Sequence, residues 1–330
     1  DLVHVHSCDE IDRLMDPNAH EAFDQLKREG KARFLGFSSH TPNLAQVAAR
    51  AIESNRFDVM MLAYHHGIWP SLGDLIHRAR REKDMGIWQT WTWSQVAEEV
   101  RAMACGLAEL GFKRGDNLAI IGDNRPRLYW AMCAAQCLGG VPVPLYQDAV
   151  AAEMVFVLQD AGIKFAIVED QEQVDKLLEI KAQCPDLQHI LYDDPRGLRH
   201  YNQSFLHGLD EVQEMGRIHN RNHPEFLDGE IEQGRQDDVA VMLYTSGTTG
   251  KPKGVCQTHG AFIAAAQSGC EFDKLVPEDN ILSYLPMAWV GDHLFSFAQA
   301  TYAGFTINCP ESGDTVMTDM REIGPSYYFA

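Results

Sequence analysis

Hydrophobic and polar positions along the first third of the chain follow the periods of strands and helices in turn. Three short apolar runs predict buried strands: residues 1–6, 32–39 and 57–66. Helices are predicted between them, the first starting at Asp16-Pro17 and ending at Gly30, the second starting at Thr41-Pro42. The second carries an apolar face made of Leu44, Val47, Ala48, Ala51 and Ile52. With a third helix over residues 71–86, these strand–helix units predict a parallel sheet.

A second series of alternating elements begins near Trp88. Thr92 and Gln95 have the spacing of a helix capping box, and Gly111 is the predicted end of that helix. Strands are then predicted over residues 117–122, 141–145, 165–170, 189–192, 239–246, 280–286, 305–310 and 326–330. Helices are predicted over residues 126–138, 151–161, 171–183, 289–303 and 316–323. The pattern is that of an α/β protein.

Residues 195–238 interrupt this pattern with a polar stretch rich in His, Arg, Asn and Gln. We expect an exposed helix with loops that links two parts of one domain. Its four histidines are His200, His207, His219 and His223, whose spacings fit no regular ligand face. A solvated segment is therefore preferred to a metal site, and no metal ligands are predicted.

The composition is ordinary for a globular protein, with 45% hydrophobic and 23% charged residues among 330. A formal net charge of −19 at pH 7 argues against nucleic-acid partners. The eight cysteines form no CxxC pair and several lie in apolar stretches, which favours reduced, buried thiols and a cytoplasmic location. No apolar run reaches the length of a transmembrane segment. The chain begins at Asp1 and stops in the apolar run SYYFA, so we expect a fragment of a longer protein.

The segment YTSGTTGKPKGV, residues 244–255, carries the strongest chemical signal. It follows an apolar strand directly. Its glycines let backbone N–H groups approach a ligand, its Ser and Thr hydroxyls add donors, and its lysines add positive charge. The predicted phosphate-binding residues are Thr245, Ser246, Gly247, Thr248, Thr249, Gly250, Lys251 and Lys253. Such a loop is suited to a polyphosphate.

Two other interpretations fit part of this segment. A Walker P-loop needs a helix after its lysine, but Pro252 disfavours the helical region at Lys251, and GVCQTH predicts a strand. A simple hairpin turn would also contain Gly, Ser and Thr. The turn does not account for hydroxyls, glycines and lysines together, so phosphate binding is preferred.

The loop resembles the signature phosphate loop of the adenylate-forming superfamily, which includes acyl-CoA synthetases and luciferases. The resemblance covers about residues 88–330, where WTWSQVAEEVRAMACGLAELGF and LPMAWVGDHLFSFAQATYAGF are similar to blocks of bacterial long-chain acyl-CoA synthetases. It implies that residues 87–330 form the large N-terminal α/β domain of such an enzyme, truncated. It also implies that the loop binds the β- and γ-phosphates of ATP, and that the block around Trp289 lines the nucleotide and acyl site. Many relatives carry His at that position, and the alternative for Trp289 is a core aromatic residue.

The implied reaction is ATP-dependent activation of a long-chain fatty acid. Its carboxylate attacks the α-phosphate to give an acyl-adenylate and pyrophosphate, and the thiol of CoA then displaces AMP. Mg²⁺ and cationic side chains neutralise the charge that develops on the phosphates. The family's Mg²⁺-linked Glu, ribose-binding Asp and catalytic Lys have no counterpart in this sequence. We therefore expect the chain alone to be inactive, and the alternative is a non-catalytic nucleotide-binding fragment.

Residues 1–86 resemble a different family. DLVHVHS, EAFDQLKREGKARFLGFSSHTP and FDVMMLAYHH are similar to βα units of aldo-keto reductases, which are TIM-barrel enzymes that use NADPH. The resemblance implies an incomplete barrel, with His6 at the catalytic position and Ser38 and Ser39 at the nicotinamide contacts. The alternative is that these residues, like His4, His65 and His66, have no ligand. The family's catalytic Tyr, Asp and Lys have no counterpart, so no reductase activity is predicted, and NADPH would bind only to a complete barrel.

The segment REKDMGI, residues 81–87, joins the two series without a Gly-, Ser- or Pro-rich linker. We interpret the chain as a chimera, produced by recombination or by a sequence-assembly error. The expected fold is α/β: incomplete TIM-barrel units followed by the domain of an adenylate-forming enzyme. Open sheet edges in the partial barrel predict self-association, and peripheral membrane contact is the alternative.

Overall fold

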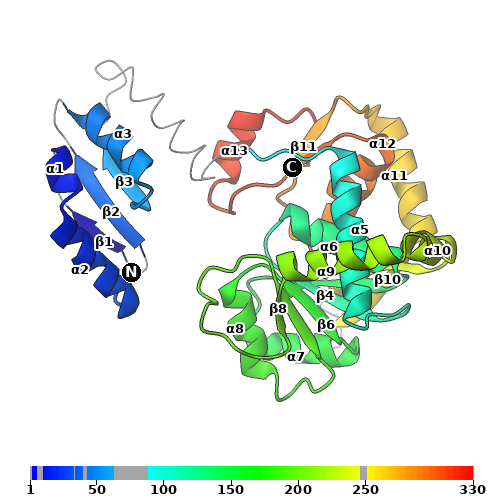
Figure 1. Cartoon of the computed structure of the whole chain (residues 1–330). Helices are drawn as coiled ribbons and strands as arrows, with labels where there is room; N and C mark the ends of the chain where they lie inside the picture. Colours follow the sequence, from blue (N-terminus) through cyan, green and yellow to red (C-terminus); the bar gives the residue numbers. More distant parts are fainter. Residues whose placement is uncertain are drawn as a thin grey trace. The chain divides into compact units, whose positions relative to one another are not determined.

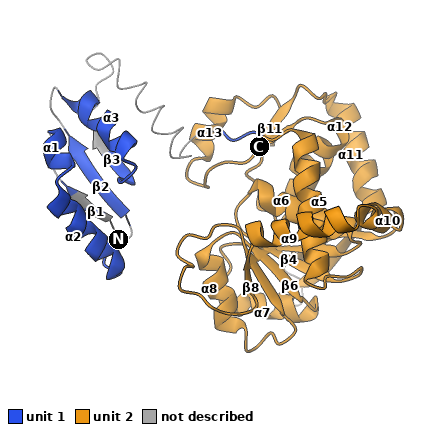
Figure 2. Cartoon of the chain, viewed as in Figure 1, with its two compact units in different colours: residues 1–90 blue, residues 91–330 orange. Residues whose placement is uncertain are grey.

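The computed structural model describes residues 2–5, 10–32, 34–39, 43–62, 88–245 and 251–329. The chain divides into two compact units, residues 1–90 and residues 91–330, which Figure 2 colours separately. Within the described ranges, no helix combines the length and the apolar character needed to cross a bilayer. The seven cysteines within these ranges are free thiols. Cys105, Cys184 and Cys270 are buried as predicted, whereas Cys256 is exposed because it lies on the outer strand β10 (Lys253–Thr258).

The first unit is a three-stranded parallel sheet whose strands are neighbours in sequence order. The strands are β1 (Leu2–Val5), β2 (Phe34–Ser39) and β3 (Val59–Leu62), and the helices are α1 (Ile11–Leu14), α2 (Pro17–Arg28) and α3 (Leu44–Ser54). Asp16 caps α2 by accepting a 2.9 Å hydrogen bond from the N–H of Asn18. The predicted apolar face of α3 is buried. The parallel sheet is confirmed. The barrel interpretation remains a prediction, and the helix predicted over residues 71–86 lies outside the described residues.

The second unit is built on a five-stranded parallel sheet of order β5-β4-β6-β7-β8, of which Figure 1 labels β4, β6 and β8. Its strands are β4 (Asn117–Ile121), β5 (Val141–Leu145), β6 (Phe165–Val168), β7 (His189–Tyr192) and β8 (Leu206–Gly208). Helices cover both faces: α5 (Trp93–Glu109), α6 (Pro126–Cys137), α7 (Ala151–Asp160), α8 (Gln171–Ile180), α9 (Leu209–Asn222) and α10 (Phe226–Glu232).

Alternate residues of β4, β6 and β7 point into two separate cores. Leu118 and Ile120 of β4 pack in a cluster with residues of α5, α6 and α9. Ala119 and Ile121 of the same strand pack in a second cluster with residues of α7 and α8. Helices that cover both faces are the usual consequence of right-handed crossovers between parallel strands. The α/β fold predicted for this part of the chain is confirmed.

The polar stretch 195–238 is more than the exposed linker that its composition indicates. It contributes the edge strand β8 and helix α9, whose Leu209, Val212 and Gly216 are buried. Helix α9 packs on α5 closely enough that a Cβ atom added at Gly216 would lie 1.7 Å from the Ala102 carbonyl oxygen. The expectation of a solvated segment is therefore wrong for α9, because its apolar positions recur at helical spacing between the charged ones.

The remaining elements follow the sheet in the chain. They are β9 (Val239–Thr245), β10 (Lys253–Thr258), α11 (His259–Asp273), β11 (Asn280–Leu282), the π-helix η1 (Asp292–Ala298), α12 (Gln299–Ala303), β12 (Thr306–Asn308) and α13 (Val316–Ile323). β9 and β10 are antiparallel, and β11 and β12 are parallel. The predicted terminal strand is wrong for the described residues up to 329, because Tyr327 forms only an isolated bridge to Ile281.

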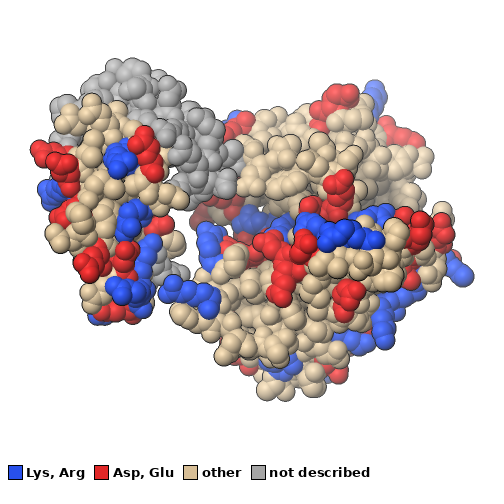
Figure 3. Space-filling model, viewed as in Figure 1, with Lys and Arg blue, Asp and Glu red and all other residues tan. Residues whose placement is uncertain are grey.

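Charged side chains of both signs are interspersed on the face of the second unit shown in Figure 3. Many of them are paired. Arg127, for example, contacts Asp193 at 2.8 Å and Asp210 at 2.6 Å. Acidic residues outnumber basic ones in the whole sequence, 47 to 28. A net charge this far from zero mainly favours solubility.

Candidate functional site

The strands on either side of the predicted phosphate loop form an antiparallel hairpin. Thr245, the last residue of β9, lies opposite Lys253, the first residue of β10. Thr245, Lys251 and Lys253 are all exposed. The five loop residues between them, Ser246, Gly247, Thr248, Thr249 and Gly250, lie outside the described residues. The hairpin therefore brings a hydroxyl and two ammonium groups to one end of a strand pair.

The chain continues as a strand after Pro252, as predicted, and not as the helix of a Walker P-loop. Gly254 lies opposite Tyr244 in the ladder. A Cβ atom at Gly254 would lie 3.0 Å from the Met242 sulfur and 3.1 Å from Cζ of Tyr244, which is tighter than ordinary contact. Because glycine has no Cβ, Met242 and Tyr244 of β9 can keep their positions.

Tyr244 anchors the base of the hairpin to helix α7. Its hydroxyl donates a 2.6 Å hydrogen bond to Asp160 Oδ2 at the end of that helix. Burial and this carboxylate raise the pKa of Tyr244 well above its usual range, so the phenol keeps its proton and remains a donor. The bond fixes the strand end that carries Thr245.

The lysines of the hairpin have few competing partners. Lys251 Nζ lies 6.0 Å from the centre of the Phe156 ring on α7, which is cation–π distance. Among the described residues, neither Lys251 nor Lys253 forms a salt bridge with a carboxylate. Cations without protein counter-charges favour an anionic ligand.

Trp289 lies in the turn after β11 and is 45% exposed. Its backbone N–H donates to the Pro286 carbonyl at 2.9 Å, and its own carbonyl accepts from the N–H of Asp292 at 3.1 Å. The exposure rules out the interpretation of Trp289 as a core aromatic residue. The ring is free to contact a ligand, although no hydrogen bond between described residues links it to the hairpin.

A buried polar network behind Trp289 was not predicted from the sequence. Asp292 is fully buried and accepts from Tyr129 at 2.7 Å, Ser283 at 3.0 Å and Asn124 at 3.2 Å. Burial raises the pKa of Asp292 to about 6, although the hydrogen bonds act in the opposite direction. Asn124 also donates to the Leu285 carbonyl at 2.9 Å. The network joins the end of β4 and helix α6 to the segment that carries Trp289.

His293, next to Asp292, supports the same turn from inside. Its Nε2 lies 2.7 Å from the Met287 carbonyl oxygen. Burial lowers the pKa of His293 to about 4, so the ring is neutral at ordinary pH and donates this bond. The turn from residue 285 to residue 292 is thus held at both of its ends.

Few of the candidate residues of the first unit lie within the described ranges. His6, His65 and His66 lie outside the described residues, and nothing is described of the side chain of His4. Ser38 and Ser39 are fully buried in β2. The predicted nicotinamide contacts therefore remain predictions.

Comparison with known proteins gives a family match. The model of the family described as AMP-binding enzyme matches residues 76–330. The Homo sapiens long-chain-fatty-acid–CoA ligase ACSBG1 is 27% identical over 263 residues, which are 77% of this chain and 35% of that protein. The Mycobacterium bovis long-chain-fatty-acid–CoA ligase FadD15 is 29% identical over 217 residues, 64% of this chain and 34% of that protein. The chain spans about a third of the length of these relatives.

Solved structures share the fold. The anthranilate CoA ligase AuaEII, in complex with anthranoyl-AMP, superposes with a TM-score of 0.62 at 19% identity, over 72% of this chain and 44% of that one. The N-terminal domain of FACL13 from Mycobacterium tuberculosis gives a TM-score of 0.56 at 26% identity, over 72% of this chain and 55% of that one. The family match leaves residues 1–75 uncovered.

Proposed function

The chain belongs to the AMP-binding enzyme family, and on this premise we propose that its second unit binds ATP as part of an enzyme that activates long-chain fatty acids. The observation that carries the proposal is the β9–β10 hairpin, which holds Thr245 opposite Lys253 with Lys251 beside them. Relatives that are named as long-chain-fatty-acid–CoA ligases support the choice of acyl substrate.

In the proposed complex, the loop binds the β- and γ-phosphates of ATP. Lys251 and Lys253 supply the positive charge, and Thr245 with Ser246, Thr248 and Thr249 supplies hydroxyl donors. A fatty-acid carboxylate that attacks the α-phosphate brings a second anion to a triphosphate. The lysines lower the electrostatic cost of this approach and stabilise the pyrophosphate that leaves. CoA would then take the acyl group from the adenylate, with release of AMP.

In the proposed complex, Mg²⁺ would be held largely by the phosphates of ATP. No group of three or more His, Cys, Asp or Glu side chains within the described ranges is arranged to hold a metal ion. Mg²⁺ usually binds through one or two carboxylates together with substrate phosphates.

Trp289 is the proposed acyl contact. It and its neighbour Val290 are both exposed, at 45% and 44%. An exposed aromatic and aliphatic pair on an anchored turn can cover an alkyl chain without a change in the fold. Replacement of Trp289 by Ala should weaken fatty-acid binding and leave ATP binding unchanged.

ATP binding to the chain, measured by calorimetry, tests the proposal. We expect the Lys251→Ala/Lys253→Ala variant to bind at least about tenfold more weakly, because two charge-assisted contacts are lost. Lys113→Ala is the matched control, since Lys113 is an exposed lysine outside the hairpin. Equal loss of affinity in the control, or no loss in the double variant, would contradict the proposal.

ATP–pyrophosphate exchange with a fatty acid separates two versions of this proposal. Exchange that depends on the fatty acid would place acyl-adenylate formation within this chain. ATP binding without exchange would favour the nucleotide-binding fragment that does not catalyse the reaction.

For residues 1–90 the reductase relationship is a separate proposal. It is supported by the parallel, sequential order of β1, β2 and β3, which is the arrangement of neighbouring strands in a βα barrel. NADPH binding by this unit, measured by titration of NADPH fluorescence with the chain, would support the relationship. We expect none, because only a complete barrel would bind NADPH.

A further inference from the structure

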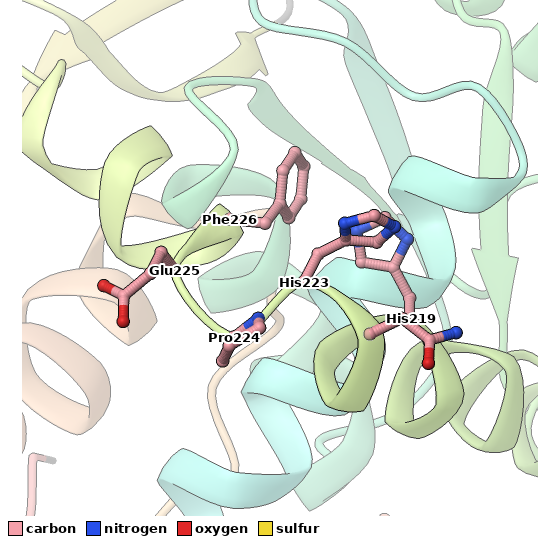
Figure 4. Close-up of a pocket in the computed structure, with 6 residues that line it drawn as sticks. His219, His223, Pro224, Glu225 and Phe226 are labelled. Carbon is pink, nitrogen blue, oxygen red and sulfur yellow. The ribbon is translucent and has the colours of Figure 1, made fainter.

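The C-terminal end of helix α9 carries two histidines beside a cavity of about 660 Å³. The lining residues are His219, Asn222, His223, Pro224, Glu225 and Phe226. Figure 4 shows the imidazole rings of His219 and His223 next to each other in this pocket. Their centres are 4.9 Å apart, and the ring planes are inclined by 46°. The cavity lies outside the hairpin and the Asp292 network.

The ring of His219 is held in a defined orientation. Its Nδ1 lies 2.5 Å from Glu109 Oε1 at the end of α5. The ring also packs edge-to-face on Phe226, with centres 4.8 Å apart. Since a carboxylate only accepts hydrogen bonds, Nδ1 carries the proton, and in the neutral ring the lone pair is on Nε2. That Nε2 atom is buried and has no hydrogen-bond partner among the residues that the structure describes.

We propose that His219 and His223 form a binding site for a divalent transition-metal ion of the Zn²⁺ or Ni²⁺ type, with Glu109 as the carboxylate that orients His219. A ligating histidine that donates its second ring N–H to a carboxylate is the usual arrangement in metal proteins. Imidazole nitrogen is a preferred ligand of these ions. The unpartnered Nε2 atom gains a partner when the ion binds.

The separation of the two rings fits a shared ion. With metal–nitrogen bonds of about 2.0–2.1 Å and a tetrahedral angle, two ligating imidazole centres lie about 5 Å apart. The observed separation is 4.9 Å. No third His, Cys, Asp or Glu side chain of the described part completes the set, so water fills the remaining positions.

The four-residue spacing of His219 and His223 does place them one helical turn apart. The other two histidines of the polar stretch, His200 and His207, do not line this cavity, so the irregular spacing of all four does not exclude a site made by two of them. A bound ion would connect the last turn of α9 to the end of α5 through Glu109. Binding to the native state alone would also raise the melting temperature.

The test is calorimetric titration of the chain with NiCl₂ in a buffer free of chelators. We expect one saturable site that is lost in the His219→Ala/His223→Ala variant. Glu109→Gln should weaken binding about 10–100-fold, which is the usual effect of losing an orienting partner. His200→Ala and Cys256→Ser are the controls, since both residues are exposed and lie outside the cavity, and neither should change the affinity.

His223→Ala is the decisive single variant. His223 is exposed, whereas the side chain of His219 is only 14% exposed and its loss also removes packing. We expect His223→Ala to keep the far-UV circular dichroism and melting temperature measured in EDTA, and to lose the Ni²⁺-induced rise in melting temperature. Undiminished Ni²⁺ affinity in a folded His223→Ala variant, or no saturable binding by the native chain, would overturn the proposal.

Discussion

Tyr129 donates a 2.7 Å hydrogen bond from its hydroxyl to Asp292 Oδ2, although the two residues are 163 positions apart in the sequence. Tyr129 belongs to α6, which packs on the parallel sheet, and Asp292 begins the π-helix η1. Both side chains are buried. Asp292 also accepts a hydrogen bond from the hydroxyl of Ser283. This one carboxylate therefore connects the sheet layer to both ends of the turn that carries Trp289.

Asp292 should make the stability of the second unit depend on pH. Folding raises the pKa of this carboxyl from 3.8 to about 6, so the folded state holds the proton more tightly than the unfolded chain. The resulting stabilisation is complete below the unfolded pKa and is lost as pH rises through the folded one. We expect wild type to lose about 2 kcal/mol relative to Asp292→Asn between about pH 4.5 and pH 7.5. Urea unfolding of both proteins at several pH values measures this difference.

Asp292→Asn is a matched variant, because the amide has the same shape and does not titrate. Its oxygen can accept from Ser283, and its NH₂ group can donate to the Tyr129 hydroxyl. A stability difference between the two proteins that does not change with pH would show that Asp292 does not titrate in this range.

Helices and strands whose own residues show a regular apolar pattern or a cap were predictable from the sequence. Strand β4 and helix α5 follow from apolar periodicity and from the Thr92–Gln95 capping box, which need only neighbouring residues. Helix α11 has no such signal, since only Ala266 and Cys270 of its fifteen residues are buried and no apolar stripe results. The Asp292 network was not predictable for another reason: its members come from residues 124–129 and 283–296, and only the tertiary fold brings them together.

Part of the candidate site was also predictable from local sequence, and part depends on the tertiary fold. The loop signal lies in consecutive residues, so the strand before Thr245 and the strand starting at Lys253 could be predicted locally. The contact of Tyr244 with Asp160, by contrast, depends on how α7 packs beside β9. Composition was misleading for α9, because its many charged residues hide a narrow apolar stripe that contacts α5.

Thr92→Ala should destabilise the second unit by about 1 kcal/mol. The Thr92 hydroxyl accepts from the N–H of Gln95 at 3.2 Å, and the Gln95 side chain accepts from the N–H of Thr92 at 2.8 Å. Loss of the hydroxyl leaves an N–H group of the first helical turn without a partner. Urea unfolding gives the change, and Thr92→Ser, which keeps the hydroxyl, should remain close to wild type. Equal losses in both variants would mean that the methyl group of Thr92 matters and the cap does not.

Arg125→Lys should destabilise the second unit by about 1.5–3 kcal/mol, although it keeps the charge. The guanidinium donates to Glu169 Oε1, to the Pro310 carbonyl and to the Glu311 carbonyl, each at 2.7 Å. An ammonium group cannot reach all three acceptors from one position. Arg101→Lys is the control, because among the described residues Arg101 pairs only with the exposed Asp228, and exposed pairs contribute little. Similar losses in both variants, measured by urea unfolding, would contradict a special role for the geometry of Arg125.

Gly106→Ala and Gly216→Ala should each destabilise the second unit by about 1–3 kcal/mol, against the usual trend for helices. Glycine inside a helix normally costs about 0.5–1 kcal/mol relative to alanine. At the crossing of α5 and α9, however, a Cβ atom on Gly106 would lie 2.1 Å from the Val212 carbonyl oxygen, and one on Gly216 would lie 1.7 Å from that of Ala102. Both obstacles are backbone atoms, so a helix must move to make room.

Gly229 of α10 provides the comparison, because its added Cβ would meet nothing within 4 Å. Gly229→Ala should therefore stabilise the unit by about 0.5–1 kcal/mol in the same thermal or urea unfolding measurement. If all three substitutions stabilise the protein, α5 and α9 do not cross at the distance described here.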